Sequence, residues 1–93
     1  MLALTQSYDQ AIAQLREAIR LDPKDAETHD NLGNLLLAQG QTAAAAEEYR
    51  QAIRIKPDFA DAHCRLGNLL GAQNKFEEAR SELQVCTQLE PNH

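Results

Sequence analysis

Two stretches of this 93-residue chain are near copies of each other: AETHDNLGNLLLAQ at residues 26–39 and ADAHCRLGNLLGAQ at residues 60–73. They are identical at 9 of 14 positions and lie 34 residues apart. In both, leucines recur at three- and four-residue spacing, which places them on one side of a helix. The two stretches therefore predict two equivalent amphipathic helices.

A second helix is predicted after each copy, over residues 42–56 and 75–90, and residues 7–21 match it one period earlier. Gly40 and Asn74 precede these segments and are residue types that tolerate the left-handed conformation at a helix end. A fixed 34-residue period predicts one helix-turn-helix unit used repeatedly, each copy burying its apolar face against its neighbours.

Prolines at 23, 57 and 91 follow the same period and are predicted to end the second helix of each unit, because proline lacks a backbone donor. Helix starts are predicted at four polar residues. Ser7 and Asn74 stand three residues before Gln10 and Glu77 in the capping-box spacing, and Asp25 and Asp58 precede the first helix of each pair.

Composition supports a single small all-α domain. Aromatic residues make up 4% of the chain and tryptophan is absent, so the core must consist of Ala, Leu and Ile. The net charge of −5 disfavours nucleic acid as a partner, since phosphate contacts need a basic surface. No apolar run reaches the roughly 18 residues of a membrane span, and we expect a soluble cytoplasmic protein without a membrane partner.

Candidate chemical groups are few. We predict that Cys64 and Cys86 are reduced and buried as small hydrophobic residues, as is usual inside cells. His29 and His63 occupy equivalent sites in successive units, too far apart to share a metal, and are predicted to pack structurally. No phosphate-binding loop or catalytic motif is visible. We therefore expect no cofactor, no metal and no enzymatic activity.

The repeated pattern resembles the tetratricopeptide repeat (TPR) family. The matching residues are Leu32, Gly33, Ala45, Ala52 and Pro57 in one unit and Leu66, Gly67, Ala79, Cys86 and Pro91 in the next. The resemblance implies a right-handed α-solenoid with a partial repeat at residues 1–24, containing only its second helix, and full repeats at 25–58 and 59–93. Gly33 and Gly67 are expected to permit close helix packing, because glycine otherwise weakens a helix.

The resemblance also implies a concave groove, lined by the first helix of each repeat, that binds a peptide. Asparagine and arginine side chains suit the recognition of peptide amides and carboxylates. A surplus of acidic groove residues favours a neutral or basic peptide. The positions that match the groove of the family and form the predicted site are Glu27, Asp30, Asn31, Asn34, Asp61, Arg65 and Asn68.

Other functions remain open at this stage. The phrase Asn-Leu-Gly-Asn-Leu also resembles repeat arrays attached to protein O-glycosyltransferases, which would make this chain a substrate-recruiting arm of a larger enzyme. The first repeat is incomplete and the last has no polar closing helix. Two hypotheses fit, and they are compatible with each other: the chain is cut from a longer array, or it is a self-assembling module that forms a homo-oligomer through its uncapped ends.

Overall fold

Five α-helices and short turns make up the described part of the chain in the computed structural model, which covers residues 2–90, with side chains from residue 7 onward. The helices are α1 (Leu2–Leu21), α2 (Ala26–Ala38), α3 (Thr42–Ile55), α4 (Ala60–Ala72) and α5 (Phe76–Leu89). No strand occurs among these residues. The predicted all-α helical repeat fold is confirmed.

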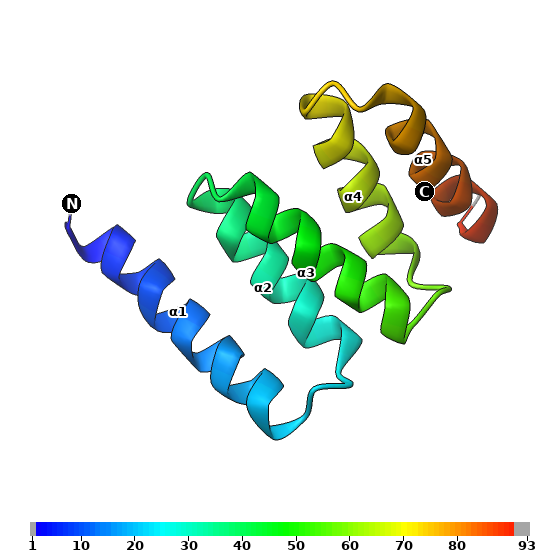
Figure 1. The fold of residues 1–93 in the computed structure, drawn as a ribbon. Coiled ribbons are helices and arrows are strands. Elements are labelled where there is room, and N and C mark those ends of the chain that lie inside the picture. Colours follow the sequence, from blue (N-terminus) through cyan, green and yellow to red (C-terminus); the bar gives the residue numbers. More distant parts are fainter. Residues whose placement is uncertain (1, 91–93) are drawn as a thin grey trace.

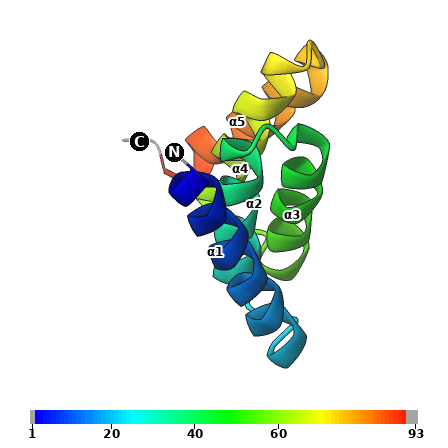
Figure 2. The ribbon, with the colours of Figure 1, turned by 90° about the vertical axis from the view of Figure 1, so that its left-hand side faces the viewer.

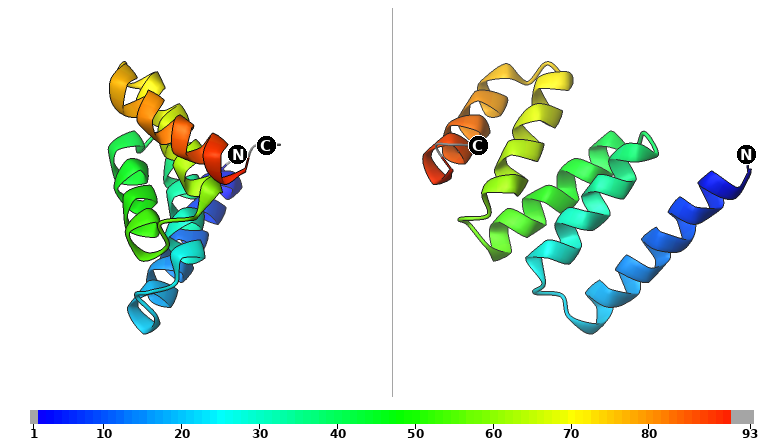
Figure 3. Two further views of the ribbon diagram at one scale, coloured as in Figure 1. Left: turned by 90° about the vertical axis from the view of Figure 1, so that its right-hand side faces the viewer. Right: turned by 180° about the vertical axis from the view of Figure 1, so that it is seen from behind.

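The helices stack in chain order along one direction (Figure 1). The most extensive contacts are those of α2 with α3 and of α4 with α5, which form two antiparallel hairpins. A less extensive contact between α3 and α4 joins the hairpins. Seen from behind in Figure 3, α1 lies at one end of the row and the α4/α5 hairpin at the other. The result is an elongated body of 38 × 28 × 22 Å.

The predicted helices match the observed ones to within one residue, except at the beginning of the chain. There α1 starts at Leu2, five residues before the predicted start at Ser7. Ser7 therefore lies inside a helix and does not cap one. Residues 2–4 belong to α1. Pro91, predicted to end the last helix, lies outside the described residues.

Of the other three capping predictions, one succeeded and two failed. The Asp25 side chain accepts a hydrogen bond from the Thr28 backbone N–H at 3.4 Å and caps α2 as predicted. Phe59, one residue after Asp58, is the N-cap of α4, and its side chain makes no capping bond. Asn74 precedes the N-cap of α5 by one residue and has φ 64°, so it serves as the left-handed residue that ends α4.

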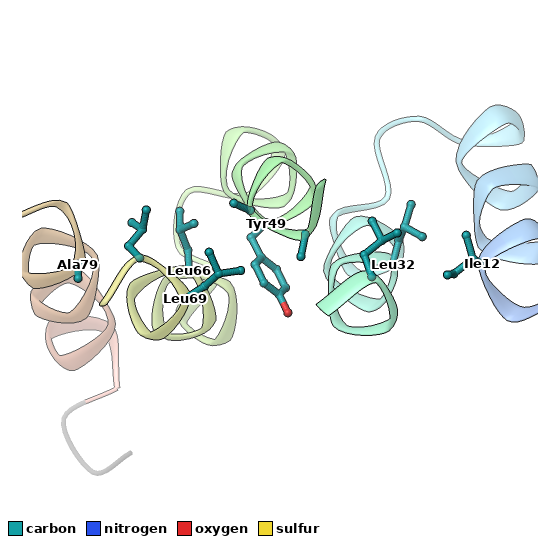
Figure 4. Close-up of a cluster of buried hydrophobic side chains, with 10 residues drawn as sticks. Ile12, Leu32, Tyr49, Leu66, Leu69 and Ala79 are labelled. Atoms are coloured by element: carbon teal, nitrogen blue, oxygen red, sulfur yellow. The ribbon is translucent and has the colours of Figure 1, made fainter. Parts of the chain in front are cut away.

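Tyr49 lies at the centre of the hydrophobic core. Its side chain projects from α3 between Leu32 of α2 and Leu69 of α4 (Figure 4), and none of its surface is exposed. Leu66 extends the same cluster along α4. Because its ring reaches both neighbouring helices, Tyr49 joins the first hairpin to the second.

Each hairpin has one point of close helix contact at a glycine. A Cβ atom built on Gly33 would lie 2.6 Å from Tyr49 Cε1, and one on Gly67 would lie 2.7 Å from Leu83 Cγ. Real Cβ atoms do not approach other atoms so closely. The two glycines are therefore required because any side chain would separate the paired helices, as the sequence predicted.

One histidine connects each hairpin to the turn before it, and the two histidines occupy equivalent positions of the repeat. His29 Nδ1 lies 2.8 Å from Glu48 Oε1 on α3, and its Nε2 lies 3.1 Å from the carbonyl oxygen of Pro23. In the second hairpin, His63 makes the same contacts with Glu82 and Pro57 at 2.6 and 2.8 Å. Carboxylate and carbonyl oxygens both accept, so both bonds form together when both ring nitrogens carry a proton. The predicted structural role of the histidines therefore consists of hydrogen bonding as well as packing.

The prediction of reduced cysteines is wrong, because Cys64 and Cys86 form a disulfide between α4 and α5. Antiparallel packing brings their Cα atoms to 5.3 Å, well within the range that a disulfide can bridge. The equivalent pair in the first hairpin is Asp30 and Ala52. Only the second of the two hairpins therefore has a covalent cross-link.

Replacing Gly67 with leucine is expected to unfold the α4/α5 hairpin, since the new side chain would overlap Leu83 and the backbone carbonyl of Ala79. Circular dichroism should show lost helix content and a lower melting temperature. Gly71→Ala is the matched control, because a Cβ there meets only the Ala79 Cβ at 3.9 Å. Unchanged melting of Gly67→Leu would contradict the packing role of this glycine.

Removal of the disulfide by Cys64→Ala with Cys86→Ala is expected to destabilise the chain by about 2–4 kcal/mol, since the cross-link restricts the unfolded state across a 22-residue separation. Chemical denaturation measures the difference. Dithiothreitol should lower the stability of the native chain and leave the double variant unchanged. Equal stability of the native and double-variant chains under oxidising conditions would refute a stabilising role.

Candidate functional site

A groove of about 410 Å³ lies where α2, α3 and α4 meet. Polar side chains from α2 and α4 form part of its wall, and leucines from the same two helices add apolar surface. Figure 2 shows α2 and α3 side by side, with α4 above them. The lining residues are Asn34, Leu37, Thr42, Tyr49, Arg65, Asn68, Leu69 and Ala72.

Tyr49 fixes the orientation of one groove side chain. Its hydroxyl donates a hydrogen bond of 2.6 Å to Asn34 Oδ1. Burial, followed by the nearby charge of Asp30, raises the pKa of the Tyr49 hydroxyl and keeps it protonated as a donor. Because the Asn34 oxygen is occupied, its amide NH₂ is the group left to face a ligand.

Arg65 links the two hairpins electrostatically. Its Nη1 donates to Asp30 Oδ2 at 2.5 Å, from α4 to α2. The arginine side chain is 39% exposed and the aspartate side chain only 5%, so the arginine shields the carboxylate from solvent. The other carboxylate oxygen, Oδ1, has no hydrogen-bond partner among the described side chains and backbone groups.

Burial raises the pKa of the Asp30 carboxyl above its ordinary value. The positive charge of Arg65 acts in the opposite direction, while the carboxylates of Asp61 and Glu27 raise the pKa further. Three acidic groups therefore lie close enough to interact, with Arg65 as the cation bound to one of them. The local balance of charge is negative.

Six of the seven predicted site residues fall into two groups. Asn34, Arg65 and Asn68 line the same groove. Glu27, Asp30 and Asp61 form the acidic group beside it, within which Asp30 is buried and cannot contact a ligand unless Arg65 moves. The seventh residue, Asn31, belongs to neither group. It is exposed on α2, between Asp30 and Asn34 in the sequence.

Sequence analysis did not identify Tyr49 as part of the site, although it orients Asn34 and lines the groove. The available signal was its tyrosine side chain at a position where the neighbouring repeats have Leu15 and Leu83. The partners of the two histidines were also not predicted: Glu48 and Glu82 each lie 19 residues after the histidine that they contact.

Two other kinds of site were sought in the described part of the chain. No three His, Cys, Asp or Glu residues come together there in a way that could hold a metal ion. None of the described helices combines the length and apolar character needed to cross a membrane.

Comparison with family models matches the whole sequence. The TPR repeat model matches residues 1–40 and 33–74, and the tetratricopeptide repeat model matches residues 60–93. The chain belongs to the tetratricopeptide repeat family. A comparison with curated protein sequences gave no significant match.

Solved TPR structures resemble this chain over most of its length. A crystal structure of MamA has a TM-score of 0.89 at 26% identity and covers 95% of this chain and 52% of its own. The first TPR of Spaghetti (RPAP3), bound to the HSP90 peptide SRMEEVD, has a TM-score of 0.89 at 25% identity and covers 96% and 71%. This chain therefore spans about half the length of MamA.

Replacing Asp30 with asparagine is expected to change how stability depends on pH. Because the folded-state pKa of Asp30 is raised, its ionised form is less favourable in the folded than in the unfolded state. The native chain therefore loses stability relative to Asp30→Asn as pH rises from the ordinary carboxyl range through the raised pKa. Urea denaturation of both proteins between pH 4 and 7 measures this difference.

The exposed residue Asp58 provides the control for this experiment, since Asp58→Asn makes the same chemical change away from the groove. A stability difference between Asp30→Asn and the native chain that stays constant with pH, or that shifts in favour of the native chain as pH rises, would contradict the assigned pKa direction.

Proposed function

We propose that this chain is a non-catalytic protein-interaction module that binds an extended peptide segment in the groove between α2 and α4. The observation that carries the proposal is the convergence of Asn34, Arg65 and Asn68 on one groove. Family membership supports it, as does the similar fold of the Spaghetti TPR, which was solved with a bound peptide.

The groove offers hydrogen-bonding groups beside an apolar surface. The amide of Asn68 both donates and accepts, and the Asn34 amide donates, so together they match the alternating groups of a peptide backbone. Leu37 and Leu69 supply apolar surface for one ligand side chain. Such a mixture of apolar surface and a few convergent polar groups is typical of a specific binding site.

The charge of this surface favours a neutral or basic peptide. Arg65 is already paired with Asp30, so an acidic ligand would have to compete with a buried carboxylate for it. Glu27 and Asp61 add negative charge beside that pair. The ligand class is therefore expected to differ from the acidic SRMEEVD peptide of the Spaghetti structure.

A phage-displayed library of 12-residue peptides, selected on the immobilised chain, tests the proposal. The strongest binder is then titrated by calorimetry into the native chain, Asn68→Ala and Arg65→Ala. Each substitution is expected to weaken binding about 5- to 30-fold, since loss of one hydrogen bond to a ligand costs roughly 1–2 kcal/mol. Selected sequences should be neutral or basic.

Glu47→Ala serves as the matched control, because Glu47 is exposed and lies two residues before Tyr49 in α3, on the opposite side of that helix. Its affinity should equal that of the native chain. Unchanged affinity of both Asn68→Ala and Arg65→Ala would exclude the groove as the binding site.

A further inference from the structure

Two pockets of the same size lie at equivalent places in successive repeats. One is formed between α1 and the α2/α3 hairpin, the other between α3 and the α4/α5 hairpin, and each has a volume of about 290 Å³. Neither shares a residue with the groove between α2 and α4. We call them the arginine pockets, because two arginines of one helix border each of them: Arg16 and Arg20 in the first, Arg50 and Arg54 in the second.

The 34-residue period relates the two pockets to each other. Every residue that lines the second pocket has its counterpart in the first, which has His29 in addition. The counterpart pairs are Arg16 and Arg50, Ile19 and Ile53, Arg20 and Arg54, Leu32 and Leu66, and Glu48 and Glu82. The chain therefore presents the same set of side chains twice, one repeat apart.

Helix packing does not require these arginines. The equivalent positions of α5 are Gln84 and Gln88, yet α5 pairs with α4 as extensively as α3 pairs with α2. Arg16, Arg20 and Arg54 are exposed, so their charged ends face solvent. The arginines are therefore not fixed by the needs of the fold.

Each pocket has one arginine that is not paired within the chain. Arg16 and Arg54 have no ion-pair partner among the described side chains. The other arginine of each pocket pairs with a carboxylate outside it, Arg20 with Glu17 at 2.5 Å and Arg50 with Glu78 at 3.7 Å. The one carboxylate of each pocket already contacts a histidine, at 2.8 Å for Glu48 and 2.6 Å for Glu82. The guanidinium groups of Arg16 and Arg54 are therefore left to bind an anion from outside the chain.

We propose that the two arginine pockets bind an acidic segment of a partner protein, with one glutamate side chain in each pocket. The carboxylate pairs with the forked guanidinium of Arg16 in the first pocket or of Arg54 in the second. The methylene groups of the glutamate lie on the apolar wall that Ile19 and Leu32 form in the first pocket and their counterparts form in the second. Since the groove between α2 and α4 favours a neutral or basic peptide, the chain has two binding surfaces of opposite charge preference.

The repetition of the pocket determines which ligand is best suited to it. A ligand that reaches both pockets binds more tightly, since occupation of one raises the effective concentration of the ligand at the other. In an extended peptide, side chains two residues apart lie on the same side, about 7 Å from each other. A peptide of alternating glutamate and serine therefore offers a row of carboxylates at short intervals and can fill both pockets.

The test is the fluorescence anisotropy of such a labelled 12-residue peptide, titrated with the full chain. We expect saturable binding that weakens between about 50 and about 200 mM salt, because exposed charge pairs are screened. The same peptide with glutamine in place of glutamate should not bind. Arg16→Gln and Arg54→Gln should each weaken binding about 5- to 10-fold, and the double variant should bind no better than the native chain binds the glutamine peptide.

Lys75→Gln with Arg80→Gln is the matched control, since it removes two exposed positive charges that lie outside the arginine pockets. It should change the affinity by less than about 2-fold, and circular dichroism should show every variant folded. Equal affinity of the native chain and the Arg16/Arg54 double variant, or equal binding of the glutamine peptide, would overturn the proposal. So would loss of binding in Arg65→Ala, because the acidic peptide would then occupy the groove. Tighter binding of single-stranded DNA of the same length would also overturn it, because the arginines would then serve a phosphate ligand.

Discussion

The close approach of paired helices at a glycine is the constraint on which the rest of the structure depends. Gly33 and Gly67 allow a large side chain of the next helix to pack directly on the backbone, Tyr49 in one hairpin and Leu83 in the other. Because both hairpins have this glycine contact at the same position of the repeat, the second packs on the first as the next repeat of a stack. The surface between α2 and α4 is a consequence of that repetition.

The fold could be predicted from the sequence almost completely, because a 34-residue period constrains both the number of helices and their order. Gly40 and Asn74 were interpreted correctly as left-handed residues. Helix starts were less predictable. Asp58 offers a capping side chain, but the N-cap of α4 is the next residue, Phe59. Ser7 lies inside α1, which begins at Leu2. A local capping motif competes with the continuation of a helix, and packing elsewhere decides the outcome.

The candidate site was only partly predictable, because a repeat pattern identifies the face of a residue but not its partner. Asn34, Arg65 and Asn68 line one groove, and their role in binding stays a prediction. The burial of Asp30 beneath Arg65 depends on the distance between two hairpins, which a single repeat does not encode. The disulfide was missed for a different reason, since Cys64 and Cys86 belong to one hairpin and are adjacent only after α4 and α5 pack against each other.

The cross-link also changes where a linear stack of helices is expected to fray. In such a stack the end hairpin contacts a neighbour on one side only, so local opening should be easiest there. Here the hairpin with the uncovered face is the one whose helices are covalently joined, through Cys64 and Cys86. Breaking that bond would remove this restraint, so the amide protection of α4 and α5 is expected to depend on the thiol–disulfide balance of the surroundings.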